Sequence, residues 1–224
     1  DTTTTATGQL TATDVDHGAT ATWGVVNGTG TYGNLSVDAT GKWTYTLNNS
    51  ASNVQALASG EHVTDTFTVK VTDDKGAVTN QTVSVTVNGT NDAPVITGTS
   101  TGTAQEDVTT SASGQLAATD VDHGATATWS VLNGAGTYGS LSVDQTGKWT
   151  YTLNNSSASV QDLGQGQHVT DTFTVQVTDD KGAVSTQSVV LTINGTNDAP
   201  IVTSAIPDQA VTLNTPFTVN TASR

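Results

Sequence analysis

The sequence repeats itself once at a spacing of 106 residues, and this repeat restricts the fold more than any other feature. The Gly-Gln-Leu of residues 8–10 recurs at 114–116, Trp43 recurs at Trp149, and every matched pair has the same offset. About three residues in four are identical between the copies. Such a period is too long for one unit of a solenoid, but it suits a whole β-sandwich domain of about 100 residues. We therefore expect two domains in series.

Polar and apolar residues alternate along several short segments of each copy. Trp43, Tyr45 and Leu47, for example, alternate with two threonines. Alternation with a period of two predicts half-buried β-strands, and no helical run of comparable strength is present. The predicted strands are residues 10–12, 21–25, 35–37, 43–47, 66–71 and 83–87 of the first copy, with residues 94–96 opening the second. The sequence therefore predicts an all-β chain of tandem Ig-like or cadherin-like β-sandwich domains with about seven strands each.

The two copies differ in extent. We place the first at residues 1–92 and the second at residues 93–198. At the offset of 106, Asp1 matches Asp107, so the first copy lacks a counterpart of residues 94–106 and with it the predicted opening strand. Residues 199–224 depart from the repeat, and we expect them to begin a third, different β domain. With no Met and a start at Asp1, the sequence reads as a fragment of a longer protein.

The chain is strongly acidic, with a net charge of −14 and a pI near 4.1. This charge opposes binding to nucleic acid and to anionic membranes, so we expect neither partner. Clustered carboxylates repel one another, and a divalent cation relieves that repulsion. The sequence contains no Cys, which excludes a disulfide framework and a Cys-based zinc site. No apolar run approaches the roughly 20 residues that cross a bilayer, so we expect no membrane insertion.

Acidic residues recur near the ends of the predicted strands. The clearest case is Asp120-Val121-Asp122, because an Asp-x-Asp on extended backbone points both carboxylates to the same side. Calcium takes six to eight oxygen ligands, which several such loops can supply together. The alternative is that Asp, Asn and Gly only form turns and keep the surface soluble. Recurrence of the whole acidic set favours Ca²⁺ binding.

Four motifs resemble those of a known family: Thr90–Val95 (TNDAPV), Ala118–Asp122 (ATDVD), Gly136–Leu141 (GTYGSL) and Val177–Gly182 (VTDDKG). Through them, residues 1–200 resemble the cadherin-like repeats, often called VCBS or Bap-like, of giant bacterial RTX-type adhesins, many exported by type I secretion. The resemblance implies a structural extender region of a secreted protein on the bacterial cell surface. Such a region holds a ligand-binding tip away from the cell and supports adhesion and biofilm formation. Calcium between domains stiffens it.

The resemblance also implies a set of calcium ligands at the junction between the copies. Glu106 matches the acidic residue near the start of a domain, and Asp120 and Asp122 match the Asp-x-Asp pair. Glu61 of the first copy matches the glutamate of the family's Leu-Asp-Arg-Glu motif. All of these are expected to converge on one junction. The candidate ligands are Glu61, Asn88, Thr90, Asn91, Asp92, Glu106, Asp107, Asp120, Asp122, Asp179 and Asp180, with Asp14, Asp16, Asp73 and Asp74 in the first copy and Asn197 and Asp198 after the second.

The sequence departs from the family pattern in two ways. The linker carries one carboxylate, Asp92, where animal cadherins usually carry two, so we expect one or two ions per junction rather than three. Gln167 replaces the counterpart of Glu61 in the second copy, so the following junction should bind calcium more weakly. The sequence contains no preceding domain that could add ligands to Asp14 and Asp16, so we expect any calcium site there to have only part of its ligands.

Two other functions remain open. The four Trp residues could form a sugar-stacking platform of a glycan- or ligand-binding module, although their phase with neighbouring apolar residues predicts core positions. Homophilic adhesion between identical repeats is the other alternative. The most divergent stretch, residues 51–61 against 157–167, carries no aromatic residue, which favours a spacer over a recognition module. We expect the partners to be neighbouring repeats of the same chain and the chain to be monomeric.

No motif of an enzyme is present. The sequence has no nucleophile elbow, no phosphate-binding loop and no histidine metal motif. Its histidines, His17, His62, His123 and His168, lie far apart within each copy, so we do not expect them to bind a metal. The sequence therefore predicts a non-catalytic extracellular protein with Ca²⁺ as its cofactor.

Overall fold

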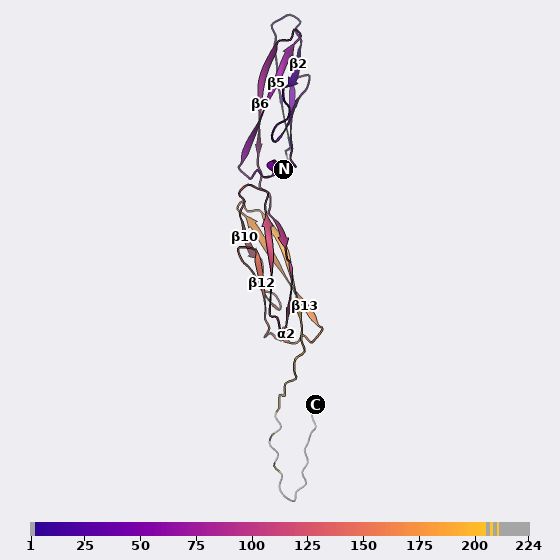
Figure 1. The fold of residues 1–224 in the computed structure, drawn as a ribbon, viewed down its shortest axis with the longest axis vertical. Helices are drawn as coiled ribbons and strands as arrows, with labels where there is room; N and C mark the ends of the chain where they lie inside the picture. Colours follow the sequence, from indigo (N-terminus) through magenta and orange to yellow (C-terminus); the bar gives the residue numbers. More distant parts are fainter. Residues whose placement is uncertain (1–2, 205–206, 208–209, 211–224) are drawn as a thin grey trace.

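The structure, a computed structural model, describes residues 3–204, 207 and 210 and consists of two β-sandwiches stacked end to end (Figure 1). The first repeat contains β1 (Thr5–Gln9), β2 (Ala21–Val25), β3 (Gly33–Val37), β4 (Lys42–Leu47), α1 (Ser52–Gln55), β5 (His62–Asp73) and β6 (Val78–Asn88). The second contains β7 (Val95–Gly98), β8 (Thr101–Gln105), β9 (Ser111–Thr119), β10 (Ala127–Val131), β11 (Gly139–Val143), β12 (Lys148–Leu153), α2 (Ala158–Gln161), β13 (His168–Asp179) and β14 (Val184–Asn194).

The strands of each repeat form two sheets. The first repeat has the sheets β1-β4-β3 and β2-β5-β6, and the second has β11-β12-β9-β7 and β10-β13-β14-β8. β8 runs parallel to β14, whereas β7 runs antiparallel to β9 in the other sheet. Since only two residues separate them, β7 and β8 are two halves of one opening strand that changes sheets. The prediction of an all-β chain of two tandem sandwiches with roughly seven strands each is confirmed.

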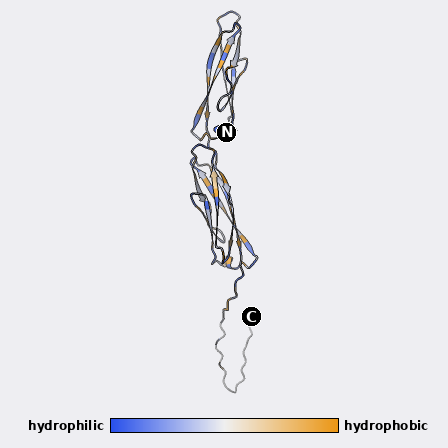
Figure 2. Cartoon of the chain, viewed as in Figure 1, coloured by the Kyte–Doolittle hydropathy of each residue, from blue (hydrophilic) through white to orange (hydrophobic). Residues whose placement is uncertain are grey.

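Apolar and polar residues alternate along the strands (Figure 2), and the inward-facing residues form one core in each repeat. Trp149 is fully buried in the second core, and Trp129 packs against it. Trp23 and Trp43 pack against the first core. The prediction that the tryptophans belong to the cores, rather than to an exposed sugar platform, is confirmed.

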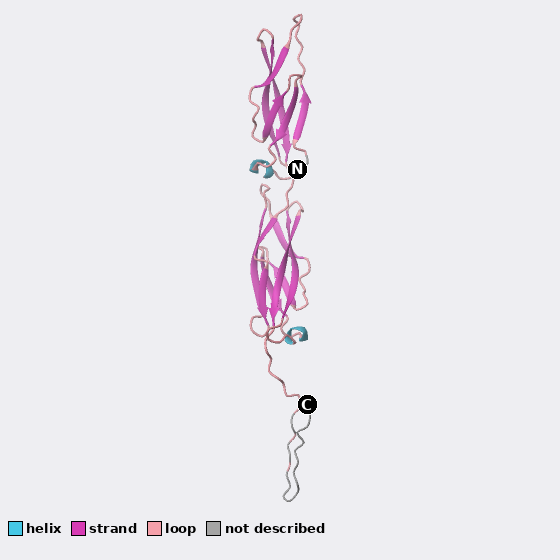
Figure 3. Cartoon of the chain, turned by 90° about the vertical axis from the view of Figure 1, so that its right-hand side faces the viewer, coloured by secondary structure: helices cyan, strands magenta, loops and turns pink. Residues whose placement is uncertain are grey.

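Each repeat carries one short helix that the sequence did not predict. α1 and α2 have four residues each and bury one valine each, Val54 and Val160. One buried residue in a single turn gives no helical periodicity to detect. Figure 3 shows both helices at the lower end of their repeats. In the second repeat, β12 leads into α2 and pairs antiparallel with β9, so the loop after β9 lies at the opposite end. We call the end of each repeat that carries the helix its lower end and the opposite end its upper end.

A buried carboxylate in each core organises the loop before β3 and β11. In the second repeat, Asp171 accepts hydrogen bonds from the backbone N–H groups of Thr137 and Tyr138, at 2.9 and 3.1 Å. It also accepts one from the hydroxyl of Tyr151 at 2.9 Å. Burial, together with this contact, raises the pKa of Tyr151. Because a buried charge is tolerated only when hydrogen-bonded, this carboxylate is a structural group of the core.

The linker between the repeats and the segment after the second repeat contain no helix or strand among their described residues. The predicted third domain at residues 199–224 falls mainly outside the described part of the chain, in which only 199–204, 207 and 210 are included. In the described residues, no helix has both the length and the apolar character needed to cross a membrane.

Candidate cation sites at the ends of the repeats

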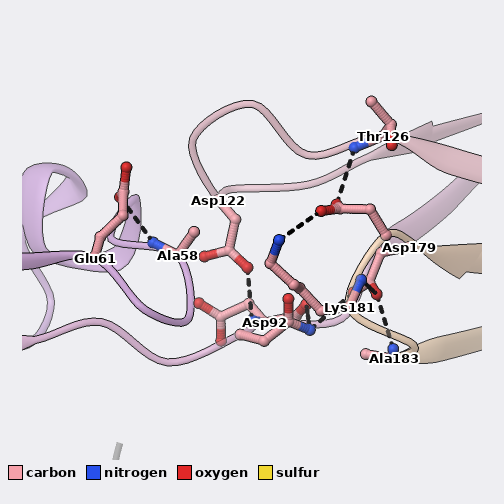
Figure 4. A network of polar contacts seen from close by, with 10 residues as sticks. Ala58, Glu61, Asp92, Asp122, Thr126, Asp179, Lys181 and Ala183 are labelled. Carbon is pink, nitrogen blue, oxygen red and sulfur yellow. Dashed lines mark hydrogen bonds and ion pairs between the residues drawn. The ribbon is translucent and has the colours of Figure 1, made fainter.

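The linker docks on the upper end of the second repeat through two hydrogen bonds (Figure 4). The Asn91 side-chain amide donates to Oδ2 of Asp179 at 2.8 Å. The backbone N–H of Asp92 donates to Oδ2 of Asp122 at 2.9 Å. Asn91 also donates to the carbonyl of Asp92 at 2.9 Å, which fixes the linker backbone between these contacts. Residues from both sides of the junction therefore meet at the Asp-x-Asp loop.

The Asp-x-Asp loop presents carboxylate oxygens that have no donor. The backbone N–H of Asp122 donates to Oδ1 of Asp120 at 3.0 Å, which closes a local turn. Oδ2 of Asp120 and Oδ1 of Asp122 are buried and accept no hydrogen bond from any described residue. The Asp122 residue is only 7% exposed. Buried carboxylate oxygens without partners are energetically unfavourable, and a cation that coordinates them would remove that cost.

The turn between β13 and β14 supplies the next two acidic residues. Oδ1 of Asp179 accepts the backbone N–H groups of Lys181 and Ala183, both at 2.8 Å. The hydrogen bond from the Asn91 amide is the main reason that the pKa of Asp179 lies below its ordinary value, and the backbone N–H groups lower it further. These contacts favour the ionised carboxylate. Asp180 forms an ion pair with the Lys181 ammonium at 2.8 Å, which lowers the pKa of Asp180. Asp179 thus contacts the linker, whereas the charge of Asp180 is balanced by the ammonium group of Lys181.

The lower end of the first repeat contacts the second through Glu61 and His123. Oε2 of Glu61 accepts the backbone N–H of Ala58 at 3.0 Å and lies 3.1 Å from Nδ1 of His123. The His123 backbone N–H donates to the carbonyl of Ala56 at 3.0 Å. These contacts, His123 above all, hold the pKa of Glu61 below its ordinary value. Sequence reasoning missed His123 as a junction residue, although its recurrence beside the Asp-x-Asp motif was a signal.

A second acidic cluster lies at the lower end of the second repeat. Carboxylate oxygens of Glu106, Asp107 and Asp198 lie within 4.8 Å of one another, the one such group of three among the described residues. Glu106 is fully buried: its Oε2 accepts the backbone N–H of Thr196 at 3.1 Å, and its Oε1 has no described donor. Asp107 is held by the side-chain amide of Asn155 at 2.6 Å, which is the main reason that its pKa is lowered.

The prediction that Glu106 converges with Asp120 at one junction is wrong. Glu106 lies before β9, and its backbone N–H donates to the carbonyl of Asn194 at the end of β14. Asp120, in contrast, lies directly after β9. The nine residues of β9 span about 30 Å at about 3.3 Å per residue. Glu106 and Asp107 therefore belong with Asp198 at the lower end of the repeat.

The corresponding acidic residues of the first repeat lie at its upper end, away from the linker. The Asp16 backbone N–H donates to Oδ1 of Asp14 at 2.9 Å, as in the second repeat. Both residues are exposed, whereas Asp122 is buried. Asp73 caps its turn and Asp74 pairs with Lys75 at 2.8 Å. The same Asp-x-Asp motif is therefore exposed in the first repeat and partly buried in the second, where the linker between the repeats docks on it.

The remaining candidate ligands lie in or beside the linkers. Asn88 is the last residue of β6, opposite His62, and Thr90 lies in the linker. Asn197 donates to the carbonyl of Asp198 at 3.4 Å, a longer form of the Asn91 contact with Asp92. Gln167 accepts the N–H of Gly164 at 2.9 Å and so keeps the local role of Glu61 without its charge.

Comparison with protein-family models identifies the same domain twice along the chain. A family model described as a bacterial cadherin-like domain matches residues 1–89 and again residues 91–195. Comparison with curated proteins gives no match.

Similar solved structures include Drosophila N-cadherin EC1-4, which is 15% identical with a TM-score of 0.49 over 84% of this chain and 44% of that chain. Mouse cadherin-23 EC22-24 is 19% identical with a TM-score of 0.45, and the match covers 81% of this chain and 56% of that chain. The human desmocollin-1 ectodomain is 15% identical with a TM-score of 0.37, and the match covers 84% of this chain and 35% of that chain. The chain spans less than two thirds of each of these chains. Through its two matched repeats, the chain belongs to the family of bacterial cadherin-like domains.

Proposed function

We propose that this chain is a spacer in a secreted adhesin on the bacterial cell surface, and that Ca²⁺ fixes the angle between its repeats. The observation that carries the proposal is the pair of buried, unpartnered carboxylate oxygens on Asp120 and Asp122, at the place where the linker docks. Domains of this family are typically non-catalytic, which agrees with a mechanical role.

The donor set at the junction suits a hard cation. Asp120, Asp122 and Asp179 offer carboxylate oxygens, and the linker adds the carboxylate of Asp92 and its neighbouring carbonyls. Calcium prefers such all-oxygen sets, with carboxylates and backbone carbonyls drawn from several loops. Zinc is disfavoured because the chain has no Cys and structural zinc sites are usually built on Cys and His.

The junction residues account for how cation binding would stiffen the chain. Without a cation, the carboxylates of Asp92, Asp120 and Asp122 repel one another and oppose the docked linker. When bound, the cation offsets this repulsion. The Asn91 contact with Asp179 and the His123 contact with Glu61 then hold the linker and the lower loop of the first repeat in one orientation. Extracellular modules bind calcium at about 10⁻⁴ to 10⁻³ M, a range suited to filling outside the cell.

Small-angle X-ray scattering of the whole chain, with calcium and with chelator, tests the proposal. We expect calcium to increase the maximum dimension and to narrow the distribution of shapes. Asp120→Asn with Asp122→Asn should abolish this response while each sandwich stays folded by circular dichroism. The matched control is Asp14→Asn with Asp16→Asn, which alters the same motif away from the junction and should keep the response. Equal responses from both double variants, or no response from the unmodified chain, would contradict the proposal.

A further inference from the structure

Each repeat contains two Asn-Gly pairs, and the two copies carry them at the same places. The pairs are Asn27-Gly28 and Asn88-Gly89 in the first repeat and Asn133-Gly134 and Asn194-Gly195 in the second. An asparagine loses its side-chain ammonia most readily before glycine, because glycine has no side chain to hinder attack by its backbone nitrogen. The structure places the two pairs of each repeat in different surroundings, so their reactivity should differ.

Deamidation of such a pair needs an accessible peptide nitrogen and then a water molecule. The backbone nitrogen of the glycine attacks Cγ of the asparagine, an N–Cγ bond forms, and the Cγ–Nδ2 bond breaks. The side-chain nitrogen leaves as ammonia and takes with it the proton of the glycine nitrogen. Water then opens the succinimide ring at either of its carbonyls. Opening at Cγ gives aspartate, and opening at the main-chain carbonyl gives isoaspartate, in which the main chain runs through the former side chain.

The pair that follows the last strand of each repeat is protected from this attack. The N–H of Gly89 donates to the carbonyl of Glu61 at 2.9 Å, and the N–H of Gly195 donates to the carbonyl of Gln167 at 3.0 Å. The two asparagines are the last residues of β6 and β14. A Cβ atom on Gly89 would lie 2.2 Å from the carbonyl oxygen of Leu57, so the backbone is enclosed there. The strand end must open before the nitrogen can attack.

The pair in the loop after β2 and after β10 has no such protection. No described residue accepts the N–H of Gly28 or of Gly134. Asn27 and Asn133 are both exposed, so water reaches them. The backbone N–H of Thr29 also donates to Oδ1 of Asn27 at 3.2 Å. A donor at this position stabilises the negative charge that develops on Oδ1 during the attack.

Packing requires glycine in these two loops. A Cβ atom on Gly28 would lie 2.6 Å from the carbonyl oxygen of Leu35, and one on Gly134 would lie 2.8 Å from that of Leu141. The carbonyls of the two glycines accept the N–H groups of the same leucines, each at 2.8 Å. Both leucines are 4% exposed and belong to the cores. The fold therefore keeps, after an exposed asparagine, the one residue type that leaves its side chain open to attack.

We propose that Asn27 and Asn133 are sites of spontaneous deamidation to aspartate and isoaspartate, and that Asn88 and Asn194 are protected from it. Each reaction replaces a neutral amide by a carboxylate and makes the acidic chain more negative. An isoaspartate also adds a methylene to the main chain beside the glycine carbonyl that holds a buried leucine. The affected loops therefore loosen as the protein ages. The proposal stands independently of the calcium function.

The test incubates the whole chain in mildly alkaline buffer and locates deamidation by proteolysis and tandem mass spectrometry. We expect Asn27 and Asn133 to react at least about tenfold faster than Asn88 and Asn194, because the protected strand ends must open first. The same incubation in urea is the control for local sequence. There the hydrogen bonds of the glycine nitrogens are lost, so all four asparagines should react at similar rates.

Variants connect the reaction to the loosening of the loops. Asn27→Gln with Asn133→Gln should stay unmodified at both positions, because glutamine would have to close a larger ring, and should keep its melting temperature through the incubation. The unmodified chain and the control Asn194→Gln should both lose melting temperature. The proposal is overturned if Asn88 and Asn194 react as fast as the loop asparagines in the folded chain, or if no asparagine reacts there while all react in urea. An equal loss of melting temperature in the double variant also overturns it.

Discussion

Asn91 and Asp179 lie 88 positions apart in the chain, and the side-chain amide of the first donates to the carboxylate of the second at 2.8 Å. The contact joins the linker to the turn between β13 and β14, and it is the main reason that the pKa of Asp179 is lowered. A group whose folded pKa is depressed contributes stability above its unfolded pKa, and this stability is lost as pH falls through the folded value. The docked linker should therefore loosen in acid.

Asn91→Ala is expected to raise the pKa of Asp179 toward its ordinary value and to loosen the linker. A carboxyl ¹³C NMR titration of Asp179 in the absence of calcium measures the change. The equivalent substitution Asn197→Ala, at the lower end of the second repeat, is the control and should leave Asp179 unaffected. An unchanged titration in Asn91→Ala would show that the turn alone sets the pKa.

Glu61→Gln is expected to weaken the junction without disturbing the loop that carries it. Gln167 occupies the same place in the second repeat and accepts a backbone N–H at 2.9 Å, so the local hydrogen bond should survive. The ionised oxygen that contacts His123 is replaced by a neutral amide, which weakens this contact. Residual dipolar couplings should show broader interdomain motion, while the thermal unfolding midpoint of the first repeat stays the same. A drop in that midpoint would instead place Glu61 among the residues that fold the loop.

Tyr151→Phe is expected to destabilise the second repeat by about 1–3 kcal/mol, since it removes a hydrogen bond to a buried charge. Asp171 would keep only its backbone donors. Urea unfolding measures the loss, and Tyr45→Phe is the matched variant, because Tyr45 donates to Asp65 at 2.9 Å in the first repeat. No loss in either variant would mean that water replaces the hydroxyl without cost.

Glu106→Gln is expected to have opposite effects with and without calcium. Without calcium, replacing a fully buried carboxylate that has an unpartnered oxygen should leave the second repeat as stable or more stable. With calcium, the variant should lose the part of the increase in melting temperature that comes from the cluster of Glu106, Asp107 and Asp198, and keep the part that comes from the distant site at Asp120 and Asp122. Melting curves in calcium and in chelator measure both effects. An identical calcium response in the variant would remove Glu106 from the ligand set.

Most of the fold could be predicted from the sequence, because strand alternation and a repeat at 106 residues are local, countable patterns. The alternation of Trp43, Tyr45 and Leu47 with threonine predicts β4, and its copy predicts β12. α1 and α2 could not be predicted, because one buried valine in a single turn carries no period.

The composition of the candidate sites was less predictable. Residue types identified the acidic loops, but only the direction of β9 shows that Glu106 and Asp120 lie at opposite ends of the repeat. Asp16 and Asp122 occur in identical motifs, yet only Asp122 is buried. That difference arises from linker docking, a contact between segments that no local pattern records.

Anomalous diffraction from crystals grown in calcium tests the central claim most directly. The account predicts an anomalous peak coordinated by Oδ2 of Asp120 and Oδ1 of Asp122, the two buried oxygens that lack a donor, together with an oxygen of the linker near Asp92. Ordered water or a rotated, hydrogen-bonded carboxylate at that position, with no anomalous peak at millimolar calcium, would contradict it.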